Sequence, residues 1–381
     1  MSTRDVPTIL AIDDDPEELD SSMRAALGEK ARMIVLHPRD VEVNHLRDAD
    51  LVLVDFLLDN WPERNEAPLA MRPVSGLAVA TLLREHADIA TRKCATAFAL
   101  HSAHLDTVRG RLPPSTREHL IARLNNLEWA FAKSNKARWN QILMLAGSVL
   151  QLPRSWPMTD EKASETEALR LLDLRDEYAW FERARRNVLD CQPPIHDLRG
   201  GGHGSLFLRW LLHQVMPYPC FLWQEEWVAA RLRMSVPSLR MVMDGGGQLA
   251  DDLSSMKYSG LLAGFLGVRW WRAALEEYVW NLTDGRSIDV TALTNALKQR
   301  TTVSFDPLGA EVSIVSLDST LAADGNILSP DKAVRVRPDQ WPPFADTAWT
   351  SIQLAKDNSF LRAIVDPLDS DRLEEDEAGD R

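Results

Sequence analysis

The sequence predicts an α/β fold with five parallel strands in its first 150 residues, followed by a mainly α-helical domain with a small β portion. Three observations predict this division. Five short, β-rich apolar runs alternate with amphipathic segments over the first 150 residues, a polar stretch with two prolines interrupts the alternation, and ten of the 13 tryptophans lie after residue 150. Strands that alternate with helices are typical of a parallel sheet covered on both faces. At 381 residues the chain is also too long for one ordinary core.

The elements of the first domain follow from the alternation. Each expected strand is a short apolar run, and each expected helix is a longer segment whose apolar residues recur every three or four positions. We expect the first helix to end near Gly28. The expected strands span 8–12, 32–37, 49–56, 95–103 and 127–133, and the expected helices span 17–30, 76–87, 115–126 and 136–152.

The second domain is predicted to begin after a linker at 151–165, which the two prolines and a polar run indicate. It should extend over 166–368 and end in an acidic, disordered tail at 369–381. From residue 301 on, β-branched stretches at 301–305, 310–317 and 333–337 predict a small sheet. Before that point we expect helices at 166–189, 206–216, 225–233, 237–243, 258–266 and 269–282, with a glycine-rich loop at 193–205.

Composition and charge argue against several classes of protein. The net charge is −13, of which residues 1–150 hold −3 and the remainder −10, so a broad nucleic-acid-binding surface is not favoured, although a small basic patch stays open. No long apolar stretch or signal peptide stands out, which favours a cytoplasmic protein with no membrane partner. The three cysteines are far apart and form no CxxC pair, which argues against a disulfide framework or a zinc site.

Polar residues with complementary chemistry follow the expected strands of the first domain. Asp13 and Asp14 follow the first strand, Asp55 ends the third, Ser102 the fourth and Lys133 the fifth. The carboxyl ends of parallel strands meet at one edge of a sheet, where function collects. Neighbouring carboxylates there suit Mg²⁺, and a hydroxyl and an ammonium could bind a phosphoryl group.

These residues resemble the receiver domain of bacterial two-component response regulators. The resemblance rests on "LAIDDDP", "DLVLVDFLLDN", "ALHSA" and "FAKS", which occur in this order within 8–150. It implies a flavodoxin-like domain in a phosphorelay, in which Asp55 accepts a phosphoryl group from a histidine kinase. By the same resemblance, Lys133 pairs with a phosphoryl oxygen and Ser102 hydrogen-bonds another after Asp55 is modified.

The resemblance also implies a magnesium site. Asp13 and Asp14 would hold the ion together with Asp55, and the backbone carbonyl of Leu57 would be a further ligand. Mg²⁺ would neutralise charge on the phosphoryl oxygens during transfer. No enzyme activity is expected beyond phosphorylation and dephosphorylation of Asp55.

Simpler interpretations of the same residues remain. The aspartates could cap the segments that follow them, Lys133 could be a solvated lysine, and Ser102 an ordinary hydroxyl. The domain could also keep the fold without phosphotransfer.

The function of the second domain is left open between three hypotheses. It could bind a second response regulator or an effector. It could also let the first domain act as a phosphate sink, which drains phosphoryl groups from a relay of several regulators. It could instead bind DNA through a helix-turn-helix at 225–243, in which Ser235 caps the second helix and Ser238 and Arg240 face the groove. A generic helix pair is favoured over that motif because of the negative charge. An enzymatic domain is the third hypothesis, and homodimerisation stays open.

Overall fold

A computed structural model describes residues 6–61, 64–66, 73–89, 95–109, 112, 116–153, 155–157, 160–200 and 203–374. The chain divides into two compact units. Unit 1 comprises Met1–Asp173, Pro193–Gln214 and Gly260–Phe265, and unit 2 comprises Leu174–Gln192, Val215–Ser259 and Leu266–Arg381. These units do not follow the predicted boundaries, because segments from beyond residue 150 complete the core of unit 1. None of the helices in the described ranges combines the length and apolarity needed to cross a membrane.

Unit 1 contains a five-stranded parallel sheet with the strand order β2-β1-β3-β4-β5. This order is found in doubly wound, flavodoxin-like sheets, and the predicted α/β class is confirmed. Each predicted strand contains one observed strand: β1 Thr8–Ile12, β2 Arg32–Leu36, β3 Leu51–Val54, β4 Ala97–Ser102 and β5 Trp129–Ala132. β1 and β3 are buried along their whole length, which explains their uninterrupted apolar sequence.

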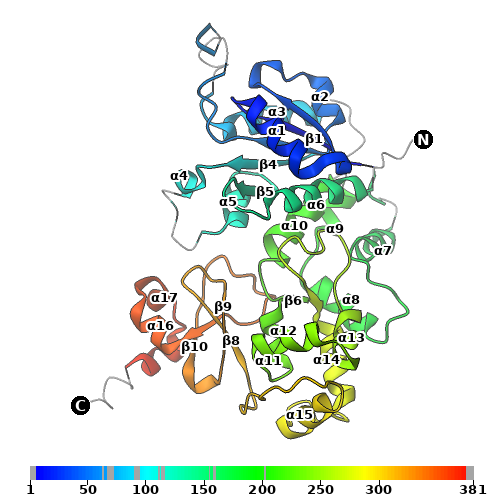
Figure 1. The fold of residues 1–381 in the computed structure, drawn as a ribbon, viewed down its shortest axis with the longest axis vertical. Coiled ribbons are helices and arrows are strands. Elements are labelled where there is room, and N and C mark those ends of the chain that lie inside the picture. Colours follow the sequence, from blue (N-terminus) through cyan, green and yellow to red (C-terminus); the bar gives the residue numbers. More distant parts are fainter. Residues whose placement is uncertain are drawn as a thin grey trace. The chain divides into compact units, whose positions relative to one another are not determined.

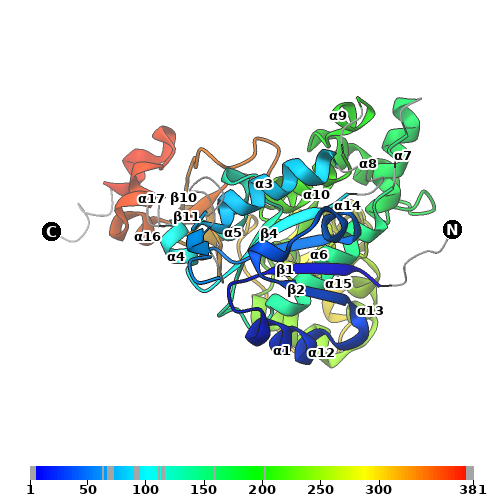
Figure 2. The ribbon, with the colours of Figure 1, turned by 90° about the horizontal axis from the view of Figure 1, so that it is seen from above.

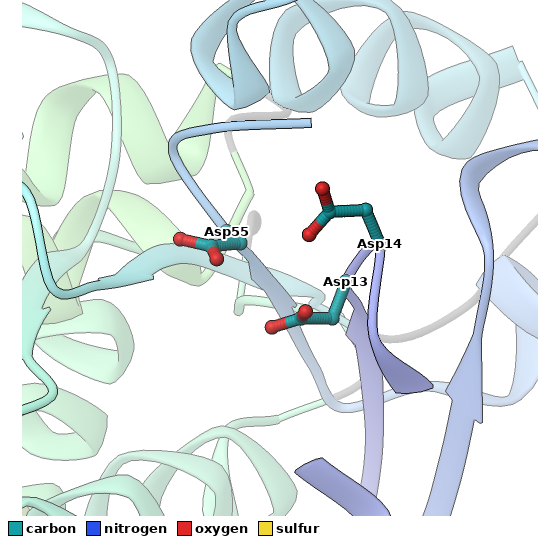
Figure 3. A group of neighbouring side chains, drawn as sticks. All are labelled: Asp13, Asp14 and Asp55. Carbon is teal, nitrogen blue, oxygen red and sulfur yellow. The ribbon is translucent and has the colours of Figure 1, made fainter. Parts of the chain in front are cut away.

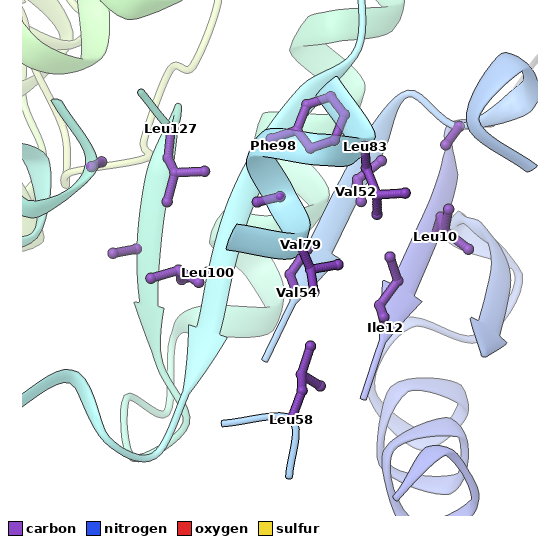
Figure 4. Close-up of a cluster of buried hydrophobic side chains, with 14 of the residues drawn as sticks. Leu10, Ile12, Val52, Val54, Leu58, Val79, Leu83, Phe98, Leu100 and Leu127 are labelled. Atoms are coloured by element: carbon purple, nitrogen blue, oxygen red, sulfur yellow. The ribbon is translucent and has the colours of Figure 1, made fainter. Parts of the chain in front are cut away.

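Helices cover both faces of this sheet, and α1 and α3 lie on opposite sides of the strands (Figure 2). On the face of α3, alternate strand residues such as Leu10, Val52 and Phe98 pack with Val79 and Leu83 of the helix (Figure 4). α1 packs against α6, which also contacts β3 and β4. The helices of unit 1 are α1 Pro16–Leu27, α2 Val43–Asp48, α3 Gly76–Ile89, α4 Leu105–Arg109, α5 Glu118–Leu124, α6 Arg138–Gln151, α7 Glu161–Leu171, α9 Ile195–Arg199 and α10 Ser205–Trp210.

Several short helices were not predicted. α2 and α4 have six and five residues, and α9 lies in the predicted glycine-rich loop. Helices of five or six residues are too short to show a recognisable periodicity in the sequence. Their stability comes from packing. The predicted linker is also partly helical, since Asp160 caps α7 and the helix begins at Glu161.

The helix predicted at 258–266 is wrong. Gly260–Phe265 forms turns that pack in unit 1, where the Leu261 N–H donates to the Leu171 carbonyl and the Leu262 N–H donates to Ser148 Oγ (3.1 Å). The Phe265 ring contacts Trp129 edge-on, with 5.0 Å between ring centroids. A β-carbon at Gly260 would lie 2.5 Å from the Leu172 backbone, so this close approach requires glycine.

Unit 2 is mainly helical with short two-stranded sheets (Figure 1). The helix predicted at 166–189 is two helices, because the chain leaves the helical conformation after α7 and Asp173 has a φ of +53°. The helices of unit 2 are α8 Phe181–Asp190, α11 Glu225–Arg231, α12 Val236–Gly245, α13 Gln248–Ser255, α14 Arg272–Leu282, α15 Val290–Lys298, α16 Ile352–Asp357 and α17 Ser359–Ala363. The strands are β6 Leu222–Trp223, β7 Trp270–Trp271, β8 Ile314–Leu317, β9 Ala323–Leu328, β10 Ala333–Arg335 and β11 Trp349–Ser351.

The predictions for the last third of the chain were partly wrong. No strand forms at 301–305, whereas β8 and β10 lie within 310–317 and 333–337. The predicted tail is folded at its start, because Asp369 is buried and binds the Arg335 guanidinium through both carboxylate oxygens (3.0 and 2.7 Å). Residues 375–381 of that tail lie outside the described residues.

Candidate metal and phosphoryl-acceptor site

Three aspartates meet at the carboxyl edge of the sheet in unit 1 (Figure 3). The Asp55 N–H donates to the Ile12 carbonyl (2.9 Å), so Asp13 and Asp55 leave neighbouring strands at the same level. Asp13, Asp14 and Asp55 each offer a carboxylate oxygen, and these oxygens all lie within 4.8 Å of one another. Asp13 and Asp55 are buried, and Asp14 is half-buried. The predicted acidic residues are therefore brought together.

Lys133 joins this cluster from β5. Its Nζ donates to Asp55 Oδ2 (2.8 Å) and to Asp13 Oδ2 (3.1 Å). The lysine side chain is 30% exposed, whereas those of Asp13 and Asp55 are 5% and 10% exposed. Lys133 is thus an ion-pair partner of two buried carboxylates and not a solvated lysine at a strand end.

Backbone N–H groups bind three further carboxylate oxygens of the cluster. Asp13 Oδ1 accepts from the Asp15 N–H (3.0 Å), Asp55 Oδ1 from the Phe56 N–H (2.7 Å) and Asp14 Oδ2 from the Asn60 N–H (3.2 Å). Asp15 itself caps α1 by accepting from the Glu18 N–H. Within the run of three aspartates, the third therefore serves the helix and the first two serve the cluster.

The electrostatics of the cluster favour a further cation. Burial, followed by the negative charges of Asp13 and Asp55, raises the pKa of Asp14. Burial alone lowers the pKa of Lys133, but its hydrogen bond with Asp55 and the charges of Asp55 and Asp13 outweigh burial and raise it. The cluster thus contains three carboxylates and one ammonium. A divalent ion would relieve the repulsion between Asp14 and the carboxylates of Asp13 and Asp55.

The chemistry of the donors fits Mg²⁺. All three side chains offer carboxylate oxygens, which are the hard ligands that Mg²⁺ prefers, and one or two of them suffice beside water or phosphate oxygens. Leu57 lies two residues after Asp55 and forms an antiparallel bridge with Ser75. The hydrogen bonds of that bridge use the Phe56 carbonyl and the Leu58 N–H, and not the Leu57 carbonyl, which was the predicted ligand.

Ser102 ends β4, the strand next to β3. It is fully buried, and its hydroxyl accepts from the His104 N–H (3.0 Å). The Ser102 carbonyl accepts from the Lys133 N–H (2.8 Å), so the hydroxyl and the ammonium leave neighbouring strands. All three residues predicted to handle the phosphoryl group therefore lie at the ends of adjacent strands.

His101 precedes Ser102 and was not predicted as part of the site. It is 2% exposed, its ring packs against Trp139, and within the described part of the chain neither ring nitrogen has a hydrogen-bond partner. Burial, and then the charges of Lys133 and Arg138, lower the pKa of His101 to about 3. The imidazole is therefore neutral in the folded protein.

His101 should make the fold acid-sensitive. The unfolded chain takes up this proton below pH 6.5 and the folded chain only near pH 3, so stability should fall as the pH falls through that window. We expect His101→Phe to reduce the loss measured by urea unfolding between pH 7 and pH 4, and to stabilise the neutral protein by about 1 kcal/mol. His196→Gln, at an exposed position, is the control. An unchanged pH dependence in His101→Phe would contradict this account.

Gly76, the first residue of α3, holds the chain close to Asp55. Its N–H donates to the Phe56 carbonyl (2.7 Å), and a β-carbon at this position would lie 1.7 Å from the Asp55 carbonyl oxygen. The sequence marks Gly76 only as the start of a helix. The contact that requires glycine is with the backbone of Asp55, which is distant in the sequence, so a local pattern does not reveal it.

A buried ion-pair network at the start of β5 was also missed. Glu128 is fully buried, and its carboxylate accepts from the Phe98 N–H, from Arg84 of α3 (3.0 Å) and from Arg209 of α10 (2.7 Å). His213 Nε2 lies 2.9 Å from the Glu128 carbonyl oxygen. An acidic residue within the apolar run "LEWAFA" was the signal in the sequence.

Of the two residues predicted to contact DNA, one is buried and the other is exposed. α11 and α12 form a helix pair, and Ser235 caps α12 as predicted by accepting from the Ser238 N–H (3.2 Å). Ser238, however, is buried and its hydroxyl bonds to Ser235 Oγ, so the prediction that it faces a groove is wrong. Arg240 is exposed but forms an ion pair with Glu225.

Similarity to known proteins assigns no family to this chain. The five-stranded parallel sheet and its helices establish the α/β class from the structure itself. The sequence matches neither a protein-family model nor a curated protein.

Proposed function

We propose that this protein is a response regulator whose unit 1 is a receiver domain that accepts a phosphoryl group on Asp55 from a histidine kinase. One observation carries the proposal: Asp13, Asp14 and Asp55 converge at the carboxyl edge of a 2-1-3-4-5 parallel sheet, and Lys133 binds two of them. Ser102 on the adjacent strand supports it. The simpler interpretation of the aspartates as caps fits Asp15, which caps α1, but it does not explain why Lys133 binds both Asp13 and Asp55.

The chemistry is a transfer from nitrogen to oxygen. A carboxylate oxygen of Asp55 attacks the phosphorus of a phosphohistidine, the P–N bond breaks as the P–O bond forms, and the departing imidazole takes a proton. Asp13 and Asp14, together with Asp55, would hold Mg²⁺, which supplies positive charge to the phosphoryl oxygens. Lys133 is held in place by the carboxylates and would offer its ammonium to a phosphoryl oxygen. The Ser102 hydroxyl, whose oxygen accepts from the His104 N–H, would donate its proton to a phosphoryl oxygen.

Phosphorylation by a small-molecule donor tests this proposal directly. Full-length protein incubated with acetyl phosphate and Mg²⁺ should gain one phosphoryl group by intact-mass spectrometry, and EDTA should prevent the gain. Asp55→Asn should gain none, because the nucleophile is lost while the shape of the side chain is kept.

Asp59→Asn is the matched control. Asp59 lies four residues further along and is exposed, so its variant should be labelled as fully as wild type. Labelling of Asp55→Asn to the wild-type level would rule out Asp55 as the acceptor. A folded wild-type protein that takes up no phosphoryl group from acetyl phosphate or from a histidine kinase would count against the whole proposal.

A further inference from the structure

Unit 2 contains a pocket of about 340 Å³, which is at the lower end of the range for small-molecule sites. Residues of α11 line one side of the pocket. This helix packs against β6, β8 and β9 (Figure 1). Three tryptophans line the pocket, each from a different segment: Trp223 of β6, Trp227 of α11 and Trp349 of β11. Trp223 is buried with the Arg272 guanidinium over its ring (5.2 Å to the centroid), and the half-buried Trp227 and Trp349 offer flat apolar surfaces to a ring-shaped ligand.

Two arginines bring positive charge to the same pocket. Arg231 ends α11, and Arg233 lies two residues later and is 7% exposed. Within the described ranges neither guanidinium lies within 4 Å of a carboxylate oxygen, although the charge of Glu276 acts on Arg231 from further away. Arg231 Nε is buried with no hydrogen-bond partner there. Arg233 donates to the Glu311 carbonyl. The acidic residue in the wall, Asp346, is already bound by Arg272 (2.7 Å).

The backbone conformation of Arg233 also supports a role for this arginine in the pocket. Its φ is +56°, a conformation that costs a residue with a β-carbon on the order of 1 kcal/mol and that glycine adopts freely. The turn between α11 and α12 would therefore form more readily with glycine. Arginine at this position instead places a second cation beside Arg231, and burial together with the charge of Arg231 lowers the pKa of Arg233.

The combination of charges and rings narrows the class of ligand. Three tryptophans alone would suit a quaternary ammonium ion, but two arginines without carboxylate partners repel such a cation. Guanidinium groups bind phosphate and carboxylate through pairs of hydrogen bonds, and two of them together match the double charge of a phosphate monoester better than a single carboxylate. The volume suits one ring system with one anionic group.

We propose that this pocket binds a small phosphate monoester that carries a flat ring, such as a nucleoside monophosphate, with Arg231 and Arg233 on the phosphate and the tryptophans around the ring. This site is independent of the phosphoryl-acceptor site, because all of its lining residues belong to unit 2. It gives unit 2 a ligand-binding role that does not depend on Asp55.

Calorimetric titration of the full-length protein tests the proposal, with adenosine 5′-monophosphate, adenosine and inorganic phosphate as separate probes. EDTA is present so that no metal at the acidic cluster attracts phosphate. The nucleotide should bind, and adenosine or phosphate alone should bind at least about tenfold more weakly, since each makes only one set of contacts. Arg231→Gln should weaken nucleotide binding at least about tenfold, because one charge-assisted contact is lost.

Arg240→Gln is the control, because Arg240 is an exposed arginine of the next helix that does not line the pocket. It should bind the nucleotide as wild type does. Arg233→Gln adds a second variant, but Arg231→Gln is decisive because its backbone is ordinary helix. The proposal is overturned if the nucleotide fails to bind at millimolar concentration, if a folded Arg231→Gln binds it as wild type does, or if phosphate alone binds equally well.

Discussion

Replacement of Glu128 by glutamine should lower the free energy of unfolding by about 3 kcal/mol, because removal of one member of a buried ion pair leaves its partners uncompensated. Glu128 is fully buried, whereas the side chains of Arg84 and Arg209 are 15% and 22% exposed. The glutamine amide would keep one acceptor oxygen but turn its nitrogen towards arginine donors. Urea unfolding followed by circular dichroism measures the change.

The effect of Glu128 should also depend on pH. Burial alone raises the pKa of this carboxyl, but the charges of Arg84 and Arg209 and the Phe98 N–H outweigh burial and lower it below its ordinary value of 4.5. A carboxyl whose pKa is depressed in the fold stabilises above its unfolded value and loses that contribution as the pH falls through the folded value. The difference between wild type and Glu128→Gln should thus be complete at pH 7 and shrink below pH 4.5.

Glu118→Gln is the matched control for Glu128→Gln. Glu118 also binds an arginine, Arg109 (2.7 Å), but its side chain is 39% exposed. Exposed ion pairs contribute about 0 to 1 kcal/mol, so this variant should unfold nearly as wild type does. Equal stability of Glu128→Gln and wild type at pH 7 would show that the network does not stabilise the fold.

The sequence predicted the sheet and most of the site because both depend on local patterns. Runs such as "LVLV" are buried from end to end, and the charged residues that follow β1, β3 and β5 mark the edge of a parallel sheet. Asp13, Asp14, Asp55 and Lys133 could therefore be assigned to one place before their distances were known.

The features that the sequence did not predict depend on contacts between distant segments. Glu128 is charged within an apolar run, and only α10, some 80 residues later, provides Arg209 to bind it. Residues 260–265 look helical by composition, but they fold as turns because they fill space beside β5 and α6. Such positions are decided by tertiary packing, which local propensity does not contain.

Gly76→Ala should impair both the fold and the acceptor site. A β-carbon would lie 1.7 Å from the Asp55 carbonyl oxygen and 2.8 Å from its carbonyl carbon, which are backbone atoms that no side-chain rotation can move away. Relief of this clash requires a shift of the chain that carries Asp55. We expect a loss of about 3 kcal/mol or more in unfolding free energy, at the upper end for overpacking. Urea unfolding followed by circular dichroism measures this loss.

The same shift should separate Asp55 from its partners. The Asp55 carboxylate is held by Lys133 (2.8 Å) and by the Phe56 N–H (2.7 Å), and the Phe56 carbonyl accepts from Gly76 itself. Displacement of this backbone moves Asp55, the proposed nucleophile, relative to Asp13 and Lys133. Labelling by acetyl phosphate should fall at least about tenfold even in the fraction that remains folded, because a misplacement of about 1 Å can lower a rate a hundredfold.

Gly147→Ala separates this steric effect from a general effect of replacing glycine. Gly147 lies inside α6, and a β-carbon there would have no neighbour within 4 Å. Alanine favours the helix by about 1 kcal/mol over glycine, so this variant should be at least as stable as wild type and should be labelled equally. A Gly76→Ala protein with wild-type stability and labelling would mean that α3 and Asp55 do not approach as closely as the structure places them, and that the position of Asp55 does not depend on this contact.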